Sequence, residues 1–327
     1  MSVSPADKIY VAGHRGLVGS ALVRALQAAG YRNLALRPHA ELDLLDGAAV
    51  RAFFAAERPR HVLFAAAKVG GILANDSYPA EFAYQNLMMQ SHVIHEAWRS
   101  KVDRLLFLGS SCIYPRDCPQ PMREEYLLTG PLEPTNRAYA VAKIAGIETC
   151  WSYNRQYATR YLSAMPTNLF GPGDNYDLET SHVLPALIRK MHEAKQRGEP
   201  TVGVWGTGTP RREFLYSEDM AEACVFLMTL PDPRYAELVR PDVLPLVNIG
   251  AGSDQSIAEL AKLVARVVGY KGELVFDRSK PDGTPRKLLD VSKLAALGWK
   301  ARIGLEEGIS LSYADFLAHQ PGQRQSA

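Results

Sequence analysis

The stretch that decides the fold is KIYVAGHRGLVGSALVRALQAAG, residues 8–30. It begins with a short apolar run typical of a buried strand. From residue 17 its apolar side chains recur at helical spacing up to Gly30, a common helix stop. Between the two runs the chain carries the pattern G-x-x-G-x-x-G, with its glycines at Gly13, Gly16 and Gly19. A glycine turn between a strand and a helix predicts a dinucleotide-binding site.

Each glycine of this turn has an expected role. Gly13 permits the tight turn, Gly16 lets the backbone approach a pyrophosphate, and Gly19 lets the helix pack closely on the strand. The N-terminus of the helix then faces a negatively charged group. We expect the other turn residues to contact the same cofactor, namely His14, Arg15, Leu17 and Val18. The alternative is a packing turn that binds no phosphate.

The end of the second predicted strand indicates which dinucleotide binds. NAD sites usually place an acid there, whereas NADP sites place arginine near the 2′-phosphate. Here Arg37 and His39 precede the first acid, and Arg15 lies in the glycine turn. This pattern favours NADP(H) as the cofactor. In the alternative, Glu41 or Asp43 holds the 2′-hydroxyl of NAD.

The order of strand and helix continues along the first half of the chain. Further strands are expected at 34–37, 61–67, 104–111 and 161–172, and helices at 46–57, 81–100 and 136–157. This alternation, with short connections, predicts the α/β class. We expect a Rossmann-type doubly wound parallel sheet with helices on both faces.

Beyond residue 170 the alternation breaks, because proline, glycine and charged residues become frequent. We therefore expect an NADP-binding Rossmann domain over 1–170 and a smaller mixed α/β domain that binds the substrate over 171–320. Segments near 212–250 are expected to pack back onto the first domain. The polar residues 321–327 read as a flexible tail.

Composition excludes several classes of function. The chain has 327 residues, of which 47% are hydrophobic and 22% charged, and a formal net charge of +2. Nothing in this balance favours a nucleic acid or a membrane surface as partner. No signal peptide or membrane-spanning run is recognisable. Four cysteines without metal-type spacing predict free thiols, no bound metal and a cytoplasmic protein.

A tyrosine and a lysine form the clearest catalytic pattern. Tyr139 and Lys143 lie four residues apart on a predicted helix, hence on one face. A lysine beside a phenol favours the phenolate and lowers its pKa. Ser110, at the end of the strand before, is placed to bond the same substrate oxygen. Together these groups suit proton donation to a carbonyl that receives hydride.

These features resemble the extended, nucleotide-sugar-modifying branch of the short-chain dehydrogenase/reductase superfamily. Longer segments resemble in particular the GDP-L-fucose synthase family, among them AGHRGLVGSA, AAAKVGGI, GSSCIYP, LEPTNRAYAVAKIAG, SHVLPAL, VWGTGTPRREFL and KPDGTPRKLLD. The resemblance implies an NADPH-dependent 3,5-epimerase/4-reductase that acts on GDP-4-keto-6-deoxy-D-mannose, a GDP-sugar. It also implies a homodimer through the helices at 81–100 and 136–157.

The resemblance assigns roles to individual catalytic residues. Tyr139 is the implied proton donor to the C4 oxygen, Lys143 bridges to the nicotinamide ribose, and Ser110 is the second hydrogen-bond partner of the carbonyl. Cys112 and His182 are the implied acid/base pair for epimerisation. Without the flanking motifs, a cysteine after a strand more often reads as a small buried hydrophobe.

Binding residues follow from the same resemblance. The cofactor side includes the strand-end residues Leu108, Gly109, Ser110, Ser111, Pro166, Thr167, Asn168 and Leu169, together with Lys143 and His182. The GDP side includes Lys190, Trp205, Arg212, which would face the diphosphate, and Lys287. One departure concerns His39, because the family pattern carries a further arginine there. This departure weakens the expected clamp on the 2′-phosphate.

The implied chemistry agrees with the residue types. In a 4-keto sugar, C3 and C5 flank the carbonyl, so deprotonation of either gives an enolate with its charge on O4. Inversion needs one group to remove a proton and another to return one to the opposite face. A thiol and an imidazole, with reference pKa values of about 8.5 and about 6.5, straddle neutrality.

Two other functions stay open at this point. One is a nucleotide-sugar 4-epimerase or dehydratase that keeps its NAD bound. The Asp-Glu pair that dehydratases would place near Ser111 and Cys112 is absent, and 4-epimerases would lack a thiol there. The other is a non-catalytic NADP sensor, which the joint presence of Ser110, Tyr139 and Lys143 argues against.

Overall fold

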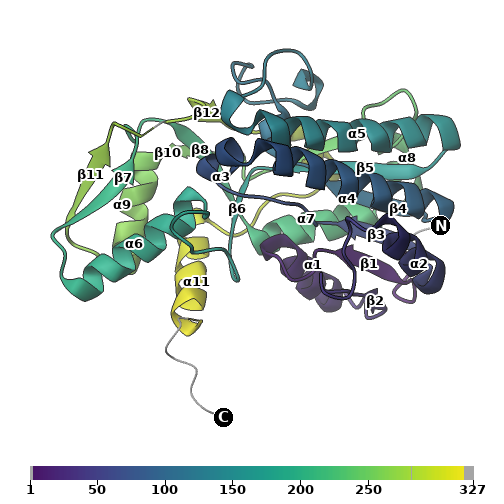
Figure 1. The fold of residues 1–327 in the computed structure, drawn as a ribbon, viewed down its shortest axis with the longest axis horizontal. Coiled ribbons are helices and arrows are strands. Elements are labelled where there is room, and N and C mark those ends of the chain that lie inside the picture. The colour runs from purple at the N-terminus through teal and green to yellow at the C-terminus, as the bar shows by residue number, and fades with distance from the viewer. Residues whose placement is uncertain (1–2, 281, 320–327) are drawn as a thin grey trace, which may run out of the picture.

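The computed structural model describes residues 3–280 and 282–319, and the predicted tail at 321–327 lies outside them. Its centre is a six-stranded, all-parallel sheet in the order β2-β1-β3-β4-β5-β9 (Figure 1). The strands are β1 (Ile9–Ala12), β2 (Leu34–Ala35), β3 (His61–Phe64), β4 (Arg104–Leu108), β5 (Arg160–Pro166) and β9 (Leu246–Ile249). The strand order reverses between β1 and β3, which is where such sheets bind ligands.

Helices cover both faces of this sheet, which explains why its inner strands are almost wholly buried. One face packs on α1 (Leu17–Ala28), α7 (Ser217–Thr229) and α8 (Asp232–Leu238), and the other on α2 (Gly47–Glu57), α4 (Pro79–Arg99) and α5 (Arg137–Tyr157). Successive strand residues alternate between the two cores: Ile9 and Val11 face one, Tyr10 and Ala12 the other. The predicted doubly wound α/β fold is confirmed.

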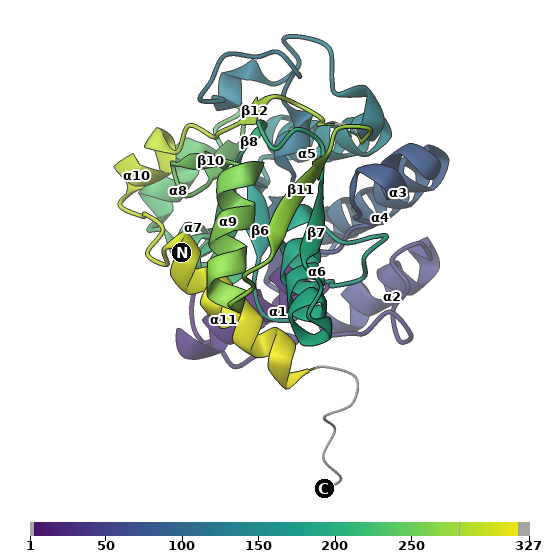
Figure 2. The same ribbon diagram turned by 90° about the vertical axis from the view of Figure 1, so that its left-hand side faces the viewer.

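A smaller part of the molecule is built around the strand β8 (Arg211–Tyr216). It pairs with β6 (Asn168–Phe170), β10 (Asp254–Ser256) and β12 (Arg286–Lys287), while β7 (Thr201–Trp205) pairs with β11 (Glu273–Asp277). The helices α6 (Val183–Arg197), α9 (Ile257–Val268) and α11 (Leu305–Ala318) enclose a third core here. Figure 2 shows this part end-on, with α6, α9 and α11 around β7 and β11.

The chain returns to the large sheet after it has entered the smaller part. The helix α7 packs on α1, and β9 adds the last strand beside β5. The helix α10 (Ser292–Leu297) then contacts β9. Sheet and smaller part are therefore interleaved along the sequence, and the two-domain division with its boundary near residue 170 stays a prediction.

Several boundaries differ from those predicted. The strand expected at 161–172 is divided into β5 and β6 at Thr167, whose backbone N–H donates to Ile249. The strand expected at 104–111 ends at Leu108, because residues Ser111–Ile113 form a 3-10 turn. A short helix, α3 (Ile72–Ser77), precedes α4 and was not predicted. Two further 3-10 turns lie at Glu124–Tyr126 and Pro134–Asn136.

Candidate active site

The glycine turn forms an open cradle at the N-terminus of α1. Gly13 has φ of +80°, and a Cβ on Gly19 would lie 2.0 Å from the carbonyl oxygen of Gly13, so both positions require glycine. A Cβ on Gly16 would meet nothing closer than 3.5 Å. Gly16 is the N-cap of α1, so the N–H groups of the first helical turn that follows it have no carbonyl partner within the helix. This cradle fits a pyrophosphate.

The other predicted cofactor contacts of the turn differ in their surroundings. Arg15 is exposed, whereas His14 carries a buried Nδ1 that has no hydrogen-bond partner among the described residues. Burial, followed by the charge of Arg15, lowers the pKa of His14. Leu17 and Val18 begin α1 and are half-buried.

Beyond β2 the predicted phosphate-binding residues already have acidic neighbours. Arg37 forms an ion pair with Glu57, lies 3.9 Å from Glu41 and stands over the Phe53 ring. His39 is 82% exposed, and its Nδ1 lies 3.8 Å from Asp43. Glu57 was not foreseen, because it comes from α2 and only the fold brings it to Arg37. The preference for a 2′-phosphate at Arg37 and His39 stays a prediction.

The predicted catalytic residues Ser110, Cys112, Tyr139 and Lys143 come together at the carboxyl edge of the sheet. Ser110 follows β4, and its hydroxyl is hydrogen-bonded to both Tyr139 and Cys112. Lys143 is buried one turn further along α5, where its Nζ donates to the carbonyl oxygen of Leu108 at 2.7 Å. That Nζ lies 5.8 Å from the centre of the Tyr139 ring.

The pKa values in this group correct one expectation. Burial raises the pKa of Tyr139 well above its ordinary value, and nearby Cys112 adds to this, so the expected lowering by Lys143 is wrong. Burial also lowers the pKa of Lys143 to about 8, while Cys112 opposes this shift. Desolvation outweighs the attraction between the two groups. Tyr139 is therefore a proton donor at neutral pH.

The strand-end residues predicted to contact the cofactor meet at one edge, because β4 and β5 are neighbours. A Cβ on Gly109 would lie 2.4 Å from the Cε of Met165, so this position also requires glycine. Thr167 is buried, and its hydroxyl donates to the carbonyl oxygen of Glu213. The others lie beside them, namely Leu108, Ser111, Pro166, Asn168 and Leu169.

One cavity of about 310 Å³ joins this catalytic group to the smaller part of the molecule. The predicted residues that line it are Ser110, Ser111, Cys112, Tyr139, Asn168, Leu169, His182, Lys190, Trp205, Arg212 and Lys287. The glycine turn and Arg37 are not among its lining residues. The structure thus brings the predicted catalytic and GDP-binding residues to one space, and Lys143 lies beneath it.

Cys112 and His182 face this cavity from different elements. Cys112 lies in the 3-10 turn after β4, and His182 is the N-cap of α6. Burial raises the pKa of Cys112, although Lys287, Ser110 and Lys143 act against it. His182 is exposed to the cavity, yet the enclosing protein, and secondly Lys287, lower its pKa. Both groups are therefore uncharged at neutral pH.

The far end of the cavity is suited to a nucleotide. Trp205 is 49% exposed, and the ammonium groups of Lys190 and Lys280 lie 5.6 Å and 5.3 Å from its ring centre. Burial lowers the pKa of Arg212 to about 10, against the attraction of Asp282 and Glu133. An open indole face beside three cations can stack a base and hold phosphates.

Sequence reasoning missed several residues of this cavity. Glu133 is a buried acid that accepts hydrogen bonds from the hydroxyls of Thr284 and Thr135. Asp282 accepts from the backbone N–H of Thr207 at 2.7 Å. Asn136 and Asn75 also line the cavity, and each has a buried side-chain oxygen without a partner among the described residues. In the sequence, the only feature that pointed to these residues was their position in or beside the recognised motifs.

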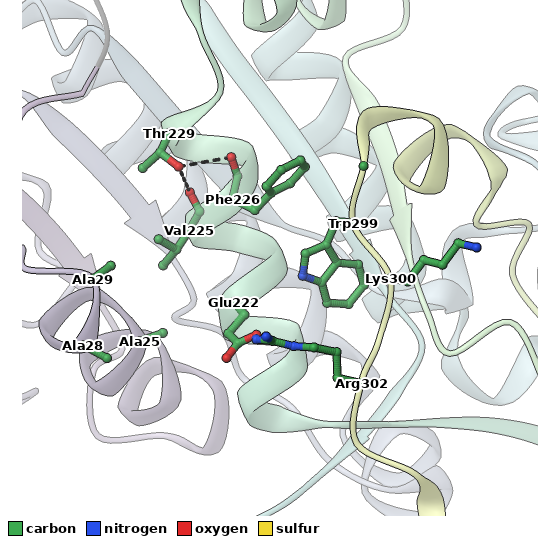
Figure 3. Close-up of a pocket in the computed structure, with 11 residues that line it drawn as sticks. Ala25, Ala28, Ala29, Glu222, Val225, Phe226, Thr229, Trp299, Lys300 and Arg302 are labelled. Carbon is green, nitrogen blue, oxygen red and sulfur yellow. Dashed lines mark hydrogen bonds and ion pairs between the residues drawn. The ribbon is translucent and has the colours of Figure 1, made fainter.

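A second cavity, of about 490 Å³, lies between α1, α7 and the segment 298–302 (Figure 3). Alanines of α1 face Trp299 and Phe226 across it, and Arg302 is paired with Glu222. None of the predicted site residues lines it. The chemistry of the chain is therefore concentrated in the smaller cavity.

Three further features concern the cysteines, possible membrane spans and possible metal ligands. All four cysteines are free thiols. Within residues 3–280 and 282–319, no helix has the length and apolarity that crossing a bilayer needs. The same residues hold no cluster of three or more metal-ligating side chains.

Comparison with known proteins identifies the family. Residues 9–238 match the NAD dependent epimerase/dehydratase family. The chain is 56% identical to the GDP-L-fucose synthase of Escherichia coli (strain K12), over 96% of this chain and 98% of that one. A GDP-6-OMe-4-keto-L-xylo-heptose reductase from Campylobacter jejuni has a similar structure, with TM-score 0.91, 39% identity and coverage of 98% and 100%. A GDP-L-fucose synthetase from Naegleria fowleri bound to NADP gives TM-score 0.85 at 27% identity, covering 97% and 96%. The chain therefore belongs to the NAD dependent epimerase/dehydratase family and, within it, to the GDP-L-fucose synthases.

Proposed function

We propose that this chain converts GDP-4-keto-6-deoxy-D-mannose to GDP-L-fucose by epimerisation at C3 and C5 and reduction at C4. One observation carries the proposal: Cys112 and His182 face the same cavity as Ser110 and Tyr139. A reductase alone needs only the second pair. Relatives with more than half of their residues identical carry the GDP-L-fucose synthase name, which does not favour a 4-epimerase or dehydratase.

The cofactor is NADPH, which supplies the hydride when bound. The open cradle at Gly16 would receive its pyrophosphate, and Arg15 and Arg37 would hold the 2′-phosphate. Lys143 would bind the nicotinamide ribose from beneath the cavity. The carboxyl edges of β4 and β5 would flank the nicotinamide ring.

The side chains divide the epimerisation between them. One member of the Cys112–His182 pair removes the proton from C3 or C5, and the C–H electron pair moves toward O4. Ser110 and Tyr139 donate hydrogen bonds to this oxygen and stabilise its charge. The other member of the pair returns a proton to the opposite face of the same carbon, which inverts it.

Reduction uses the same oxygen-binding groups. As C4 receives hydride, Tyr139 transfers its phenolic proton to O4, and Ser110 keeps the oxygen in place. Lys143, whose ammonium lies one turn away, stabilises the phenolate that remains. The raised pKa of Tyr139 keeps the phenol protonated until that moment.

Product identification tests this function directly. Purified protein is incubated with NADPH and GDP-4-keto-6-deoxy-D-mannose, and the sugar nucleotide is analysed by NMR. We expect GDP-L-fucose and one NADPH consumed for each product. A product with unchanged configuration at C3 and C5, or no NADPH consumption, contradicts the proposal.

We also propose a homodimer formed through α4 and α5. The two helices pack on each other, and their outer surfaces carry the exposed side chains Tyr84, Val141 and Tyr157. Such surfaces commonly mark a protein interface. Sedimentation velocity is expected to show a dimer, which Tyr84→Glu together with Val141→Glu dissociates. A wild-type monomer contradicts it.

The free thiols support a cytoplasmic location, which we propose as the compartment. Cell fractionation tests it: the protein and the NADPH-dependent activity are expected together in the cytoplasmic fraction.

A further inference from the structure

Lys287 brings an ammonium group to the cavity from the smaller part of the molecule. It lies on β12, which pairs in parallel with β8 so that Lys287 stands opposite Arg212. Its side chain lines the cavity together with Cys112 and His182. Lys287 therefore brings a cationic group from the C-terminal part of the chain into the cavity that holds the Cys112 thiol.

The ammonium of Lys287 has no partner of its own among residues 3–280 and 282–319, since no hydrogen bond or ion pair there involves its Nζ. The charged and titratable groups that face it are Cys112, Cys118, His182, Arg212 and Glu133. Of these, Glu133 already accepts hydrogen bonds from two hydroxyls and lies 3.5 Å from the guanidinium of Arg116. Burial lowers the pKa of Lys287, and Cys112 opposes this shift, so an ammonium at Lys287 and a thiolate at Cys112 stabilise each other.

Few positively charged groups other than Lys287 lie near Cys112. Cys112 is 6% exposed as a residue, so its thiolate loses most of its hydration. The groups near it besides Lys287 are the Ser110 hydroxyl, the Tyr139 phenol and Lys143. The ammonium of Lys143 already donates to the carbonyl oxygen of Leu108. Consistent with this, Lys287 opposes the burial-induced rise of the Cys112 pKa more strongly than Lys143 does.

We propose that Lys287 is a positioning residue for the epimerisation chemistry: its ammonium stabilises the thiolate of Cys112 inside the cavity. The thiolate is one of the two states of Cys112 whichever way the proton travels. When Cys112 acts as acid, its proton goes to carbon and the charge remains on sulfur. When it acts as base, that charge is present beforehand, and Lys287 keeps its own proton in both cases.

The proposal rests on the proposed function for its catalytic meaning, but the thiolate is measured without substrate. Wild-type protein and Lys287→Met are treated with iodoacetamide between pH 6 and pH 10.5, and the alkylation rate of the Cys112 peptide is followed by mass spectrometry. Only the thiolate reacts, so the rate reports its population at each pH.

We expect the alkylation profile of Lys287→Met to move to higher pH. A shift of one unit lowers the rate at pH 8 by about tenfold, because the thiolate fraction below the pKa changes tenfold per unit. The two proteins should converge at the highest pH. A rate lowered equally at every pH, or an unchanged profile, overturns the proposal, since it indicates altered access or no effect.

Two further variants separate charge from structure. Lys287→Arg keeps the positive charge, so we expect it to restore most of the wild-type profile. Lys190→Met removes another ammonium of the same cavity, one that lies beside Trp205 at the nucleotide end, and should leave the alkylation profile unchanged within about twofold. An equal shift in Lys190→Met contradicts a specific role for Lys287. Should Lys287→Met fail to fold, as judged by circular dichroism, Lys287→Gln serves the same comparison.

Failure of this proposal and failure of the proposed function are distinguishable. A shifted profile in a protein that forms no GDP-L-fucose supports Lys287 and rejects the function. An unshifted profile in a protein that does form GDP-L-fucose supports the function and rejects the role of Lys287.

Discussion

At the scale of single residues, burial decides the charge of most groups in the cavity. It raises the pKa of Tyr139 and of Cys112, and lowers that of Lys143 and of His182. All four shifts favour the uncharged form. At neutral pH the site therefore holds Tyr139 and Cys112 protonated and His182 uncharged, while Lys143, with a pKa of about 8, keeps its charge.

Cys112→Ala is the sharpest residue-scale test of epimerisation. Without the thiol the C3 and C5 protons lose one of their two acid–base groups, so solvent deuterium uptake at these carbons should fall at least ~100-fold. NADPH binding should be unchanged. Exchange is measured by NMR in deuterium oxide. Exchange at the wild-type rate contradicts the role of Cys112.

The lowered pKa of Lys143 predicts a pH dependence of cofactor binding. The pKa of about 8 means that the ammonium is present below this pH and is lost above it. A charged donor binds ribose hydroxyls more strongly than a neutral one, by about 1 kcal/mol, or roughly fivefold in Kd. NADP affinity, measured by fluorescence, should therefore weaken by this factor between pH 7 and pH 9.5.

The matched variant for this measurement is Lys143→Met. It should bind NADP more weakly than wild type at pH 7 and show no change of affinity through pH 8. A wild-type affinity that is flat over the whole range speaks against the predicted contact with the ribose.

The sequence predicted which residues lie in the cavity better than it predicted the neighbours that these residues contact. Ser110, Cys112 and Tyr139 lie in short, recognisable segments, so their positions at strand or helix ends could be predicted. Glu57 beside Arg37 and Glu133 near Arg212 could not, because these contacts join distant segments. The sign of the Tyr139 pKa shift was missed for the same reason, since burial depends on the whole fold.

At the scale of elements, the strand–turn–helix unit at residues 9–28 was predictable because its signals are local. The glycine pattern and the helical spacing of the apolar residues follow each other directly in the sequence. The short helix α3 was not predictable, since its six residues are too few for a periodic pattern. The break between β5 and β6 was not predicted, although Pro166, Thr167 and Asn168 interrupt the apolar run at that point.

Substitution of two glycines of the turn, Gly16 and Gly19, is expected to separate the effect on stability from the effect on cofactor binding. Gly19→Ala brings a Cβ onto the carbonyl of Gly13 and should lower the free energy of unfolding by roughly 1–3 kcal/mol. Gly16→Ala meets no such contact, so its stability should stay within about 1 kcal/mol of wild type. Its NADP affinity should nevertheless fall about tenfold or more, because the methyl group enters the phosphate cradle.

Urea unfolding and NADP titration of both variants check this pair. Normal NADP affinity in Gly16→Ala shows that the cradle does not hold the pyrophosphate. Equal stability losses in the two variants contradict the packing argument.

At the scale of the whole molecule, buried Arg104 joins the sheet to the segment after α7. Its Nη1 donates to the carbonyl oxygens of Met228 and Leu230 at 2.7 Å and 2.8 Å, and its Nη2 to Asp232. Arg104→Met leaves the two buried carbonyl oxygens without this donor, while Asp232 keeps its pair with Arg160, and should lower the free energy of unfolding by about 1–3 kcal/mol. Urea unfolding measures this. The turnover of the protein that stays folded should not change, and a neutral effect on stability contradicts the argument.

The return of α7 and β9 to the large sheet has a consequence for how this enzyme evolves. A single recombination near residue 170 with a gene for another nucleotide-sugar enzyme would exchange more than the substrate side. It would also import a foreign last strand and a foreign helix against α1, so both sheet and cavity would contain mismatched surfaces. Lineages of this architecture should therefore acquire new sugar preferences by point substitution around the cavity rather than by shuffling of gene segments.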